Sequence, residues 1–226
     1  ACWPGPLTLV VRKNPTRVCN EATAGLDTVG LRVPAHPLAL ALLEAFGGGV
    51  AAPSANRFGR VSPTTAEHVR ADLDGDVDLI LDGGPCAVGV ESTIVDVTAD
   101  EPILLRLGGV SEARLTKILG SSMTRRTTGE VAAPGTLPAH YAPKARVEII
   151  EAAALAGRAT ALREQGLNVE TIEPSGDLEA DARALYARLR AADARAADVV
   201  LAVIPDDKGI GAAIADRLRR AAASSG

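Results

Sequence analysis

The last third of the chain alternates short β-branched runs with alanine-rich segments of helical length, and this alternation constrains the fold more than any other feature. The expected strands and helices follow one another at 146–150, 151–165, 167–172, 178–192, 199–204 and 211–223. Strands that alternate with helices in this way pair in parallel, because each crossover helix returns the chain to the same end of the sheet. Residues 146–226 are therefore predicted to form a small Rossmann-like parallel α/β domain.

The first 120 residues also mix the two kinds of element. Strands are expected at 7–11, 28–33, 50–52, 77–81, 93–97 and 103–105, and helices at 37–46 and 111–119. Segment 37–46 is nearly continuous Leu and Ala, which predicts a buried helix. A further helix is expected to end near Leu73, with Ser62 as its N-cap and Pro63 at its first position. This part of the chain is therefore also expected to be α/β.

Between the two parts, residues 121–144 turn to Ser, Thr, Arg, Gly and Pro without periodicity, which is typical of a linker. We predict a first domain over 1–120, a linker or lid over 121–145 and a second domain over 146–226. The chain starts without an initiator Met and leads straight into a strand. We therefore expect the first domain to be incomplete at its N-terminal end.

Charge and composition favour a protein that acts on small molecules. A net charge of −4 gives no overall attraction to phosphate backbones, and 2% aromatic residues leave few rings to stack on bases. Both observations argue against a dedicated RNA-reading module. The cysteines Cys2, Cys19 and Cys86 lack metal-ligand spacing, and no apolar run reaches the roughly 18 residues that would span a bilayer. We expect a cytoplasmic protein with no protein-held metal and no membrane partner.

Small and hydroxyl residues gather at 52–56, where Ala52 and Ser54 lie at the end of an expected strand, with Ser62 eight residues after Ser54. Backbone N–H groups and hydroxyls just before a helix can surround an anion such as a phosphate. The same residues are also typical of a plain turn followed by an N-cap. The segment alone favours neither interpretation.

A second group of candidates combines closely spaced glycines at 83–89 with the hydroxyl of Ser92 at the start of a strand. Such glycines allow the backbone to approach a ligand, but they also form ordinary hairpin connections. Arg32 and Arg106 lie on or at the end of expected strands that otherwise have a buried pattern, where a guanidinium must be paired or must bind an anion. One such arginine is usually a structural ion pair, whereas two indicate a pocket for a carboxylate or a phosphate.

His140 and Tyr141 interrupt the polar linker. An imidazole and an aromatic ring in such a segment indicate either a lid over a binding site or an anchor that fixes the linker to a domain surface. The residues themselves do not separate these two interpretations.

Taken together, the motifs resemble the long, two-domain form of the YrdC-type threonylcarbamoyl-AMP synthases. The matching segments, in family order, are WPGPLT at 3–8, GLDTV at 25–29, RVP at 32–34, APSAN at 52–56, SPTT at 62–65, LDGG at 81–84, ESTIVD at 91–96 and HYAP at 140–143. The resemblance covers essentially the whole chain. It implies a YrdC-like twisted sheet domain with a concave site, followed by a Rossmann-like domain.

The resemblance also implies a reaction. L-Threonine and bicarbonate give a carbamate that attacks the α-phosphate of ATP with Mg²⁺ as cofactor, which yields threonylcarbamoyl-AMP and pyrophosphate. The positions that correspond to ATP contacts in the family are Thr28, Ser54, Ser62 and Arg106. Those that correspond to threonine contacts are Arg32, Ala52 and Ser92. No covalent nucleophile is implied, so catalysis would come from positioning and from stabilised charge.

The expected partners are the three substrates and the downstream threonylcarbamoyl transferase machinery of tRNA modification, with direct tRNA binding only weakly indicated. One departure from the family is that its N-terminal Lys-x-Arg element has no counterpart here; another is Leu107, where the family pattern has proline. Two alternatives follow: a nucleotide- or RNA-binding module that has lost catalysis, and a carbamoyl-adenylate-forming domain of the hydrogenase-maturation type. His140 and Tyr141, together with the second α/β domain, disfavour the latter.

Overall fold

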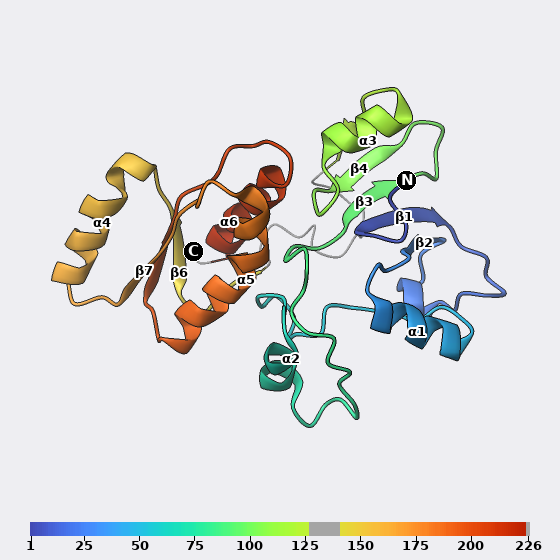
Figure 1. Ribbon diagram of the computed structural model, residues 1–226, viewed down its shortest axis with the longest axis horizontal. Coiled ribbons are helices and arrows are strands. Elements are labelled where there is room, and N and C mark those ends of the chain that lie inside the picture. The colour runs from blue at the N-terminus through green and yellow to red at the C-terminus, as the bar shows by residue number, and fades with distance from the viewer. Residues whose placement is uncertain (127–140, 225–226) are drawn as a thin grey trace. The chain divides into compact units, whose positions relative to one another are not determined.

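A computed structural model describes residues 1–126 and 141–224 (Figure 1). The chain divides into two compact units, each of which is described by itself. The first comprises Ala1–Pro53 and Glu91–Thr136, and the second Ser54–Val90 and Leu137–Gly226. Segment 54–90, which precedes the expected linker, thus belongs to the same unit as the C-terminal sheet. The boundaries at 120 and 145 stay predictions.

The described residues of the first unit contain a mixed sheet of order β2-β1-β3-β4-β5. The elements are β1 Leu7–Arg12, the 3-10 helix η1 Glu21–Thr23, β2 Thr28–Leu31, α1 Pro37–Phe46, β3 Thr93–Asp96, β4 Ile103–Arg106, α3 Glu112–Leu119 and β5 Thr124–Arg125. Strand β1 runs antiparallel to β2 and parallel to β3. This pairing brings the start of β3 beside Leu7, because Leu7 lies opposite Thr93.

Alternation along β3 and β4 sends side chains to the two faces of this sheet. One face holds the larger core, which includes the Leu115 side chain of α3. The members of this core are Leu7, Val95, Leu104, Val110, Leu115 and Met123. Ile94 and Leu105 form a separate, smaller cluster. Helix α3 keeps its expected ends, since the Ser111 hydroxyl accepts the N–H of Arg114 and Gly120 adopts the left-handed C-cap conformation.

The second unit contains helix α2, Ala66–Leu73, and the predicted βαβαβα segment. Its elements are β6 Arg146–Ile149, α4 Ala152–Glu164, β7 Val169–Ile172, α5 Leu178–Ala194, β8 Val199–Ala202 and α6 Gly211–Ala223. The strands pair in parallel in the order β6-β8-β7. Figure 1 shows α4 on one face of this sheet and α5 and α6 on the other. Every residue of β8 is buried, as expected for a strand covered on both faces. The α/β expectation is confirmed.

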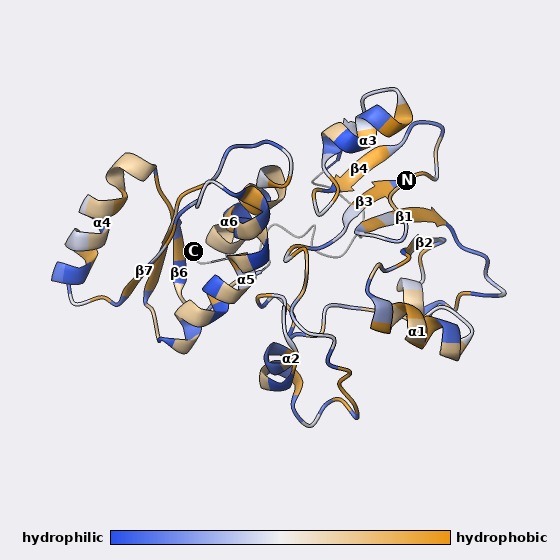
Figure 2. Cartoon of the chain, in the orientation of Figure 1, coloured by the Kyte–Doolittle hydropathy of each residue, from blue (hydrophilic) through white to orange (hydrophobic). Residues whose placement is uncertain are grey.

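Several expectations for the first 90 residues are wrong. Segments 50–52 and 77–81 are not strands, and neither pairs with a strand in the part of the chain that the structure describes. Their apolar side chains are largely exposed, as with Leu79 at 75%. Helix α1 has its expected bounds, but none of its residues is buried, and Phe46 is 65% exposed. Much of this helix has the colour of hydrophobic residues in Figure 2.

Candidate functional site

Two of the expected site residues come together where β1, β3 and β4 lie side by side. The Arg106 guanidinium, at the end of β4, donates from Nε to the Ser92 carbonyl and from Nη2 to the Ser92 hydroxyl, both at 3.1 Å. The Ser92 Oγ lies 2.7 Å from the Thr8 Oγ1 of β1. Ser92 is 5% exposed and Arg106 is 8% exposed. The unit therefore holds a buried guanidinium oriented by Ser92, next to a pair of hydroxyls.

The chain after β4 packs closely against Ser92. A Cβ at Gly108 would lie 2.4 Å from the Glu91 carbonyl oxygen, so only glycine fits this approach without a shift of the backbone. Gly109 donates its N–H to the same carbonyl. The buried Thr93 hydroxyl bonds both the carbonyl and the N–H of Val110. These contacts fix the turn that follows Arg106 against the start of β3.

The other expected residues of the first unit are more accessible. Thr28 begins β2, opposite Arg12, and is half-buried. Arg32 follows β2 and is exposed, and its Nε donates to the Gly5 carbonyl at 3.1 Å. The sequence-based expectation that Arg32 ends a buried strand is wrong, because β2 is the edge strand of its sheet. Ala52 lies in an exposed segment without regular structure.

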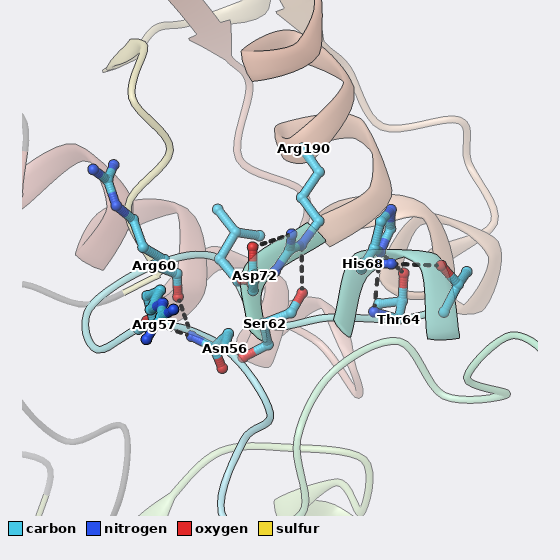
Figure 3. Close-up of polar contacts among 10 residues, drawn as sticks. Asn56, Arg57, Arg60, Ser62, Thr64, His68, Asp72 and Arg190 are labelled. Carbon is cyan, nitrogen blue, oxygen red and sulfur yellow. Dashed lines mark hydrogen bonds and ion pairs between the residues drawn. The ribbon is translucent and has the colours of Figure 1, made fainter. Parts of the chain in front are cut away.

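Ser54 and Ser62 lie in the second unit, in the loop that leads to α2. Ser54 is exposed and Ser62 is 6% exposed. The Asn56 side chain shapes the loop between them, because its amide donates to the carbonyls of Arg57 and Arg60 (Figure 3). The structure thus gives this hydroxyl-bearing loop a defined conformation.

The expected N-cap at Ser62 is wrong, because α2 begins at Ala66 and its N-cap is Thr65. The Thr65 hydroxyl accepts the N–H of His68. The Ser62 carbonyl, which a helix starting at residue 63 would use internally, instead accepts a hydrogen bond from Arg190. The Ser62 carbonyl is thus bound by a residue from a distant part of the chain, and Thr65 caps the helix.

The surroundings of His68 in α2 favour its neutral form by lowering its pKa. Its Nδ1 accepts the Thr64 N–H at 3.2 Å (Figure 3). Burial, and then the positive charge of Arg190, lower the pKa of His68 below its ordinary value of 6.5, while Asp72 and Glu67 act in the opposite direction. A proton on Nδ1 would remove the acceptor of the Thr64 hydrogen bond.

Acidification from about pH 7.5 to about pH 5.5 is expected to lower the free energy of unfolding through this histidine. Since the folded-state pKa of His68 is lowered, the unfolded chain binds the proton more readily. The contribution of neutral His68 to the free energy of unfolding is intact above pH 6.5. It is lost as the pH falls from there towards the folded-state pKa of His68. Urea titrations followed by circular dichroism at both pH values, on the native chain and His68→Gln, measure it. The same pH dependence in both proteins would contradict the assignment.

Tyr141 is an anchored residue in the second unit. Its ring is 1% exposed and stacks on Tyr186 of α5, with 5.6 Å between ring centroids. The Arg217 guanidinium of α6 lies 5.0 Å from the centroid of the Tyr141 ring, and Arg217 is fully buried. Tyr141 holds this place with a φ of 63°. His140 lies outside the described residues. The buried position of Tyr141 supports the anchor interpretation for this residue.

Two residues that contact the predicted ones were not themselves predicted to belong to the site. Thr8 belongs to a matching motif, but only the parallel pairing of β1 with β3 places it beside Ser92. Arg190 is one of several arginines on an Ala-rich helix, and no sequence pattern distinguishes it. Both residues reach the predicted ones through contacts between distant parts of the sequence.

Residues 1–126 and 141–224 lack two other kinds of feature. No group of three or more His, Cys, Asp or Glu side chains there is placed to hold a metal ion. In the same residues, no helix is both long enough and apolar enough to cross a membrane.

Two family models match the chain. A model described as "Telomere recombination", for Sua5, YciO and YrdC proteins, matches residues 1–108. A model described as "Threonylcarbamoyl-AMP synthase, C-terminal domain" matches residues 110–223. The two matches follow one another along nearly the whole chain.

Curated relatives give the same result over 97% of this chain. The threonylcarbamoyl-AMP synthase of Pyrococcus abyssi is 39% identical over 242 residues, with 71% of that protein covered. The Bacillus subtilis synthase is 37% identical over 243 residues, with 70% covered. The Schizosaccharomyces pombe synthase is 34% identical over 262 residues, with 64% covered.

Two solved structures have the same fold. A crystal structure of P. abyssi Sua5 complexed with L-threonine matches with a TM-score of 0.92 and 38% identity, over 99% of this chain and 72% of that one. A P. abyssi Sua5 variant in which a histidine and a tyrosine are replaced by alanine matches with a TM-score of 0.90 and 37% identity, over 99% and 71%.

Proposed function

The chain belongs to the threonylcarbamoyl-AMP synthase family, and we propose from this premise that it forms threonylcarbamoyl-AMP from L-threonine, bicarbonate and ATP. The observation that carries the proposal is the match over 99% of the chain to a relative solved with L-threonine. The product would supply the activated threonylcarbamoyl group for tRNA modification, through a separate transferase. A cytoplasmic location and direct contact with tRNA are parts of the proposal that need their own tests.

In the proposed reaction, the threonine amine condenses with bicarbonate, and water is lost. A carbamate oxygen then attacks the α-phosphorus of ATP, the bond to the bridging oxygen breaks, and pyrophosphate leaves. No bond to the protein forms, so the residues act by position and charge. The nucleotide would carry Mg²⁺ on its phosphates, as is usual for this ion, which supplies charge neutralisation there.

Thr28, Ser54, Ser62 and Arg106 are proposed to bind ATP. The buried Arg106 guanidinium is suited to bind a phosphate because it stays positively charged. Its hydrogen bonds to Ser92 already fix its orientation. Ser54 and Ser62 would contribute from the loop shaped by Asn56. Hydroxyls and main-chain N–H groups in such loops bind phosphate oxygens.

Arg32, Ala52 and Ser92 are proposed to bind threonine. Arg32 is exposed, and its contact with the Gly5 carbonyl uses Nε. A guanidinium can hold a carboxylate through two parallel hydrogen bonds, which fits the threonine carboxylate. For the linker, we propose that His140 belongs to a lid whose fixed end is the buried Tyr141.

The first test is pyrophosphate release with ATP, magnesium, bicarbonate and L-threonine, with each component omitted in turn. Release is expected only when threonine and bicarbonate are both present. Arg32→Ala is expected to raise KM for threonine about 10- to 100-fold, since it removes charged hydrogen bonds to the carboxylate. Its effect on KM for ATP is expected to be small.

Arg17→Ala is the matched control, because Arg17 is also an exposed arginine of the first unit. It should leave both KM values unchanged. Pyrophosphate release without threonine would contradict the proposal and favour a carbamoyl-adenylate-forming enzyme. Binding of ATP without any release would favour a module that has lost catalysis.

A further inference from the structure

We propose that Arg190 is a positioning residue for ATP, which acts by holding the main chain of the Ser62 loop from helix α5. The inference rests on the proposed function, because Ser62 matters to the reaction only if the chain uses ATP. Arg190 belongs to the C-terminal α/β segment, in which the sequence analysis predicts no substrate-binding residue. The contact lies entirely within the second unit.

The Arg190 guanidinium contacts both the loop and helix α2 (Figure 3). Arg190 Nη2 donates to the Val61 carbonyl, and Nε donates to the Ser62 carbonyl at 3.3 Å. Nη1 donates to Asp72 Oδ1 at 3.1 Å, and Nη2 also pairs with Asp72 Oδ2. Two consecutive carbonyls of the loop and one carboxylate of α2 are thus joined through one side chain, across 118 to 129 residues of sequence.

Burial makes this contact stronger than a surface ion pair. The Arg190 side chain is 14% exposed and that of Asp72 is 18% exposed, so water screens their charges less than at the surface. Val61 and Ser62, whose carbonyls Arg190 binds, are themselves buried at 2% and 6% exposure. The planar fork of arginine reaches the carboxylate and the carbonyls together, which a lysine ammonium cannot do with the same geometry.

Arg190 acts on a segment that the structure also fixes at other points. Ala142 donates its N–H to the Gly59 carbonyl, and Cys86 donates its N–H to the Thr64 carbonyl, so the loop is held on either side of Ser62. Arg190 adds the link to α5 at Ser62 itself. A loss of this link should therefore shift Ser62 without unfolding its surroundings. The expected consequence is weaker use of ATP, with little effect on threonine.

The experiment compares the full chain with Arg190→Met, which keeps side-chain length but removes all donors, and with Arg190→Lys. Steady-state pyrophosphate release should show KM for ATP raised about tenfold in Arg190→Met, with KM for threonine within about twofold. KM for ATP of Arg190→Lys should lie between those of the native chain and Arg190→Met. This variant also provides the test if Arg190→Met does not fold. Arg183→Met, at an exposed arginine of the same helix, is the matched control and should behave as the native chain.

A double-mutant cycle with Ser62→Ala tests whether Arg190 acts through Ser62. If it does, adding Arg190→Lys to Ser62→Ala raises KM for ATP by much less than Arg190→Lys does alone. Strictly additive effects, or an equal rise in KM for ATP and for threonine, would overturn the inference.

Amide hydrogen exchange separates failure of the inference from failure of the proposed function. Without substrates, the amides of Val61, Ser62 and Thr64 should exchange at least about tenfold faster in the Arg190 variants, while those of α4 stay unchanged. Unchanged exchange at the loop would overturn the anchoring itself. If the native chain shows no threonine-dependent release, the proposed function fails, and the exchange result alone then decides whether Arg190 anchors the loop.

Discussion

Replacement of Arg106 by glutamine is expected to lower kcat/KM for ATP in the pyrophosphate-release assay by about 100- to 1000-fold. Arg106 is 8% exposed, and two of its nitrogens are directed by the carbonyl and hydroxyl of Ser92. A charge held in this way needs little rearrangement when negative charge develops on the phosphate. Glutamine keeps a donor near the position of Nε but removes the charge and the two terminal nitrogens.

Arg12→Gln is the matched control, because Arg12 is an exposed arginine at the end of β1 in the same sheet. It should leave kcat/KM for ATP unchanged. Far-ultraviolet circular dichroism checks that Arg106→Gln is folded. A folded Arg106→Gln chain that retains activity within about threefold of the native chain would remove Arg106 from the site.

Gly89→Ala is expected to destabilise the second unit by about 3 kcal/mol or more. Gly89 has a φ of +81°, which side chains other than glycine rarely adopt. A Cβ there would lie 2.2 Å from the Ala182 carbonyl oxygen and 2.3 Å from the Arg183 Cα of α5. Both neighbours are helix backbone, so neither can move without distorting α5.

Gly157→Ala should instead raise the free energy of unfolding. Gly157 lies within α4, is exposed and has no atom within 4 Å of an added Cβ. Alanine in a helix interior is more stable than glycine by about 1 kcal/mol. Urea titrations followed by circular dichroism compare the two variants with the native chain. A Gly89→Ala midpoint equal to or above that of the native chain would show that residue 89 does not pack against α5.

The C-terminal half of the fold could be predicted from the sequence because its signals are local. Helix α6 has the expected bounds of 211–223, and the three strands lie within the predicted runs. Alternating β-branched runs and Ala-rich segments each specify an element without help from distant residues. Their parallel pairing follows from the connections, since a helix separates each strand from the next.

Apolar patterning alone did not predict burial in the first 90 residues. Segments 50–52 and 77–81 have strand-forming residues, but a strand also requires a neighbouring strand to complete its hydrogen bonds. Burial of helix α1 was also not predictable from its apolar residues. Its Leu- and Ala-rich sequence specifies a helix with the expected bounds, whereas burial depends on what packs against it, and Leu42 is 45% exposed.

For the candidate site, residue type was a better guide than local structure. A hydroxyl and a guanidinium pointed to Ser92 and Arg106, which the structure brings within hydrogen-bonding distance. The N-cap at Ser62 was mispredicted, because two hydroxyls, those of Ser62 and Thr65, competed for the role within four residues. The contact between Arg190 and the Ser62 carbonyl joins distant parts of the chain, so local sequence could not reveal it.

The order β6-β8-β7 has a consequence for synthesis of the chain on the ribosome. The last strand to be made, Val199–Ala202, is the central one, and the two earlier strands pair with it rather than with each other. Until it has emerged, β6 and β7 lack their partner, and the helices that should cover them have no sheet to pack on. Folding of this sheet therefore waits for nearly the whole C-terminal segment, and the nascent chain exposes apolar strand surface that chaperones can bind in the interval.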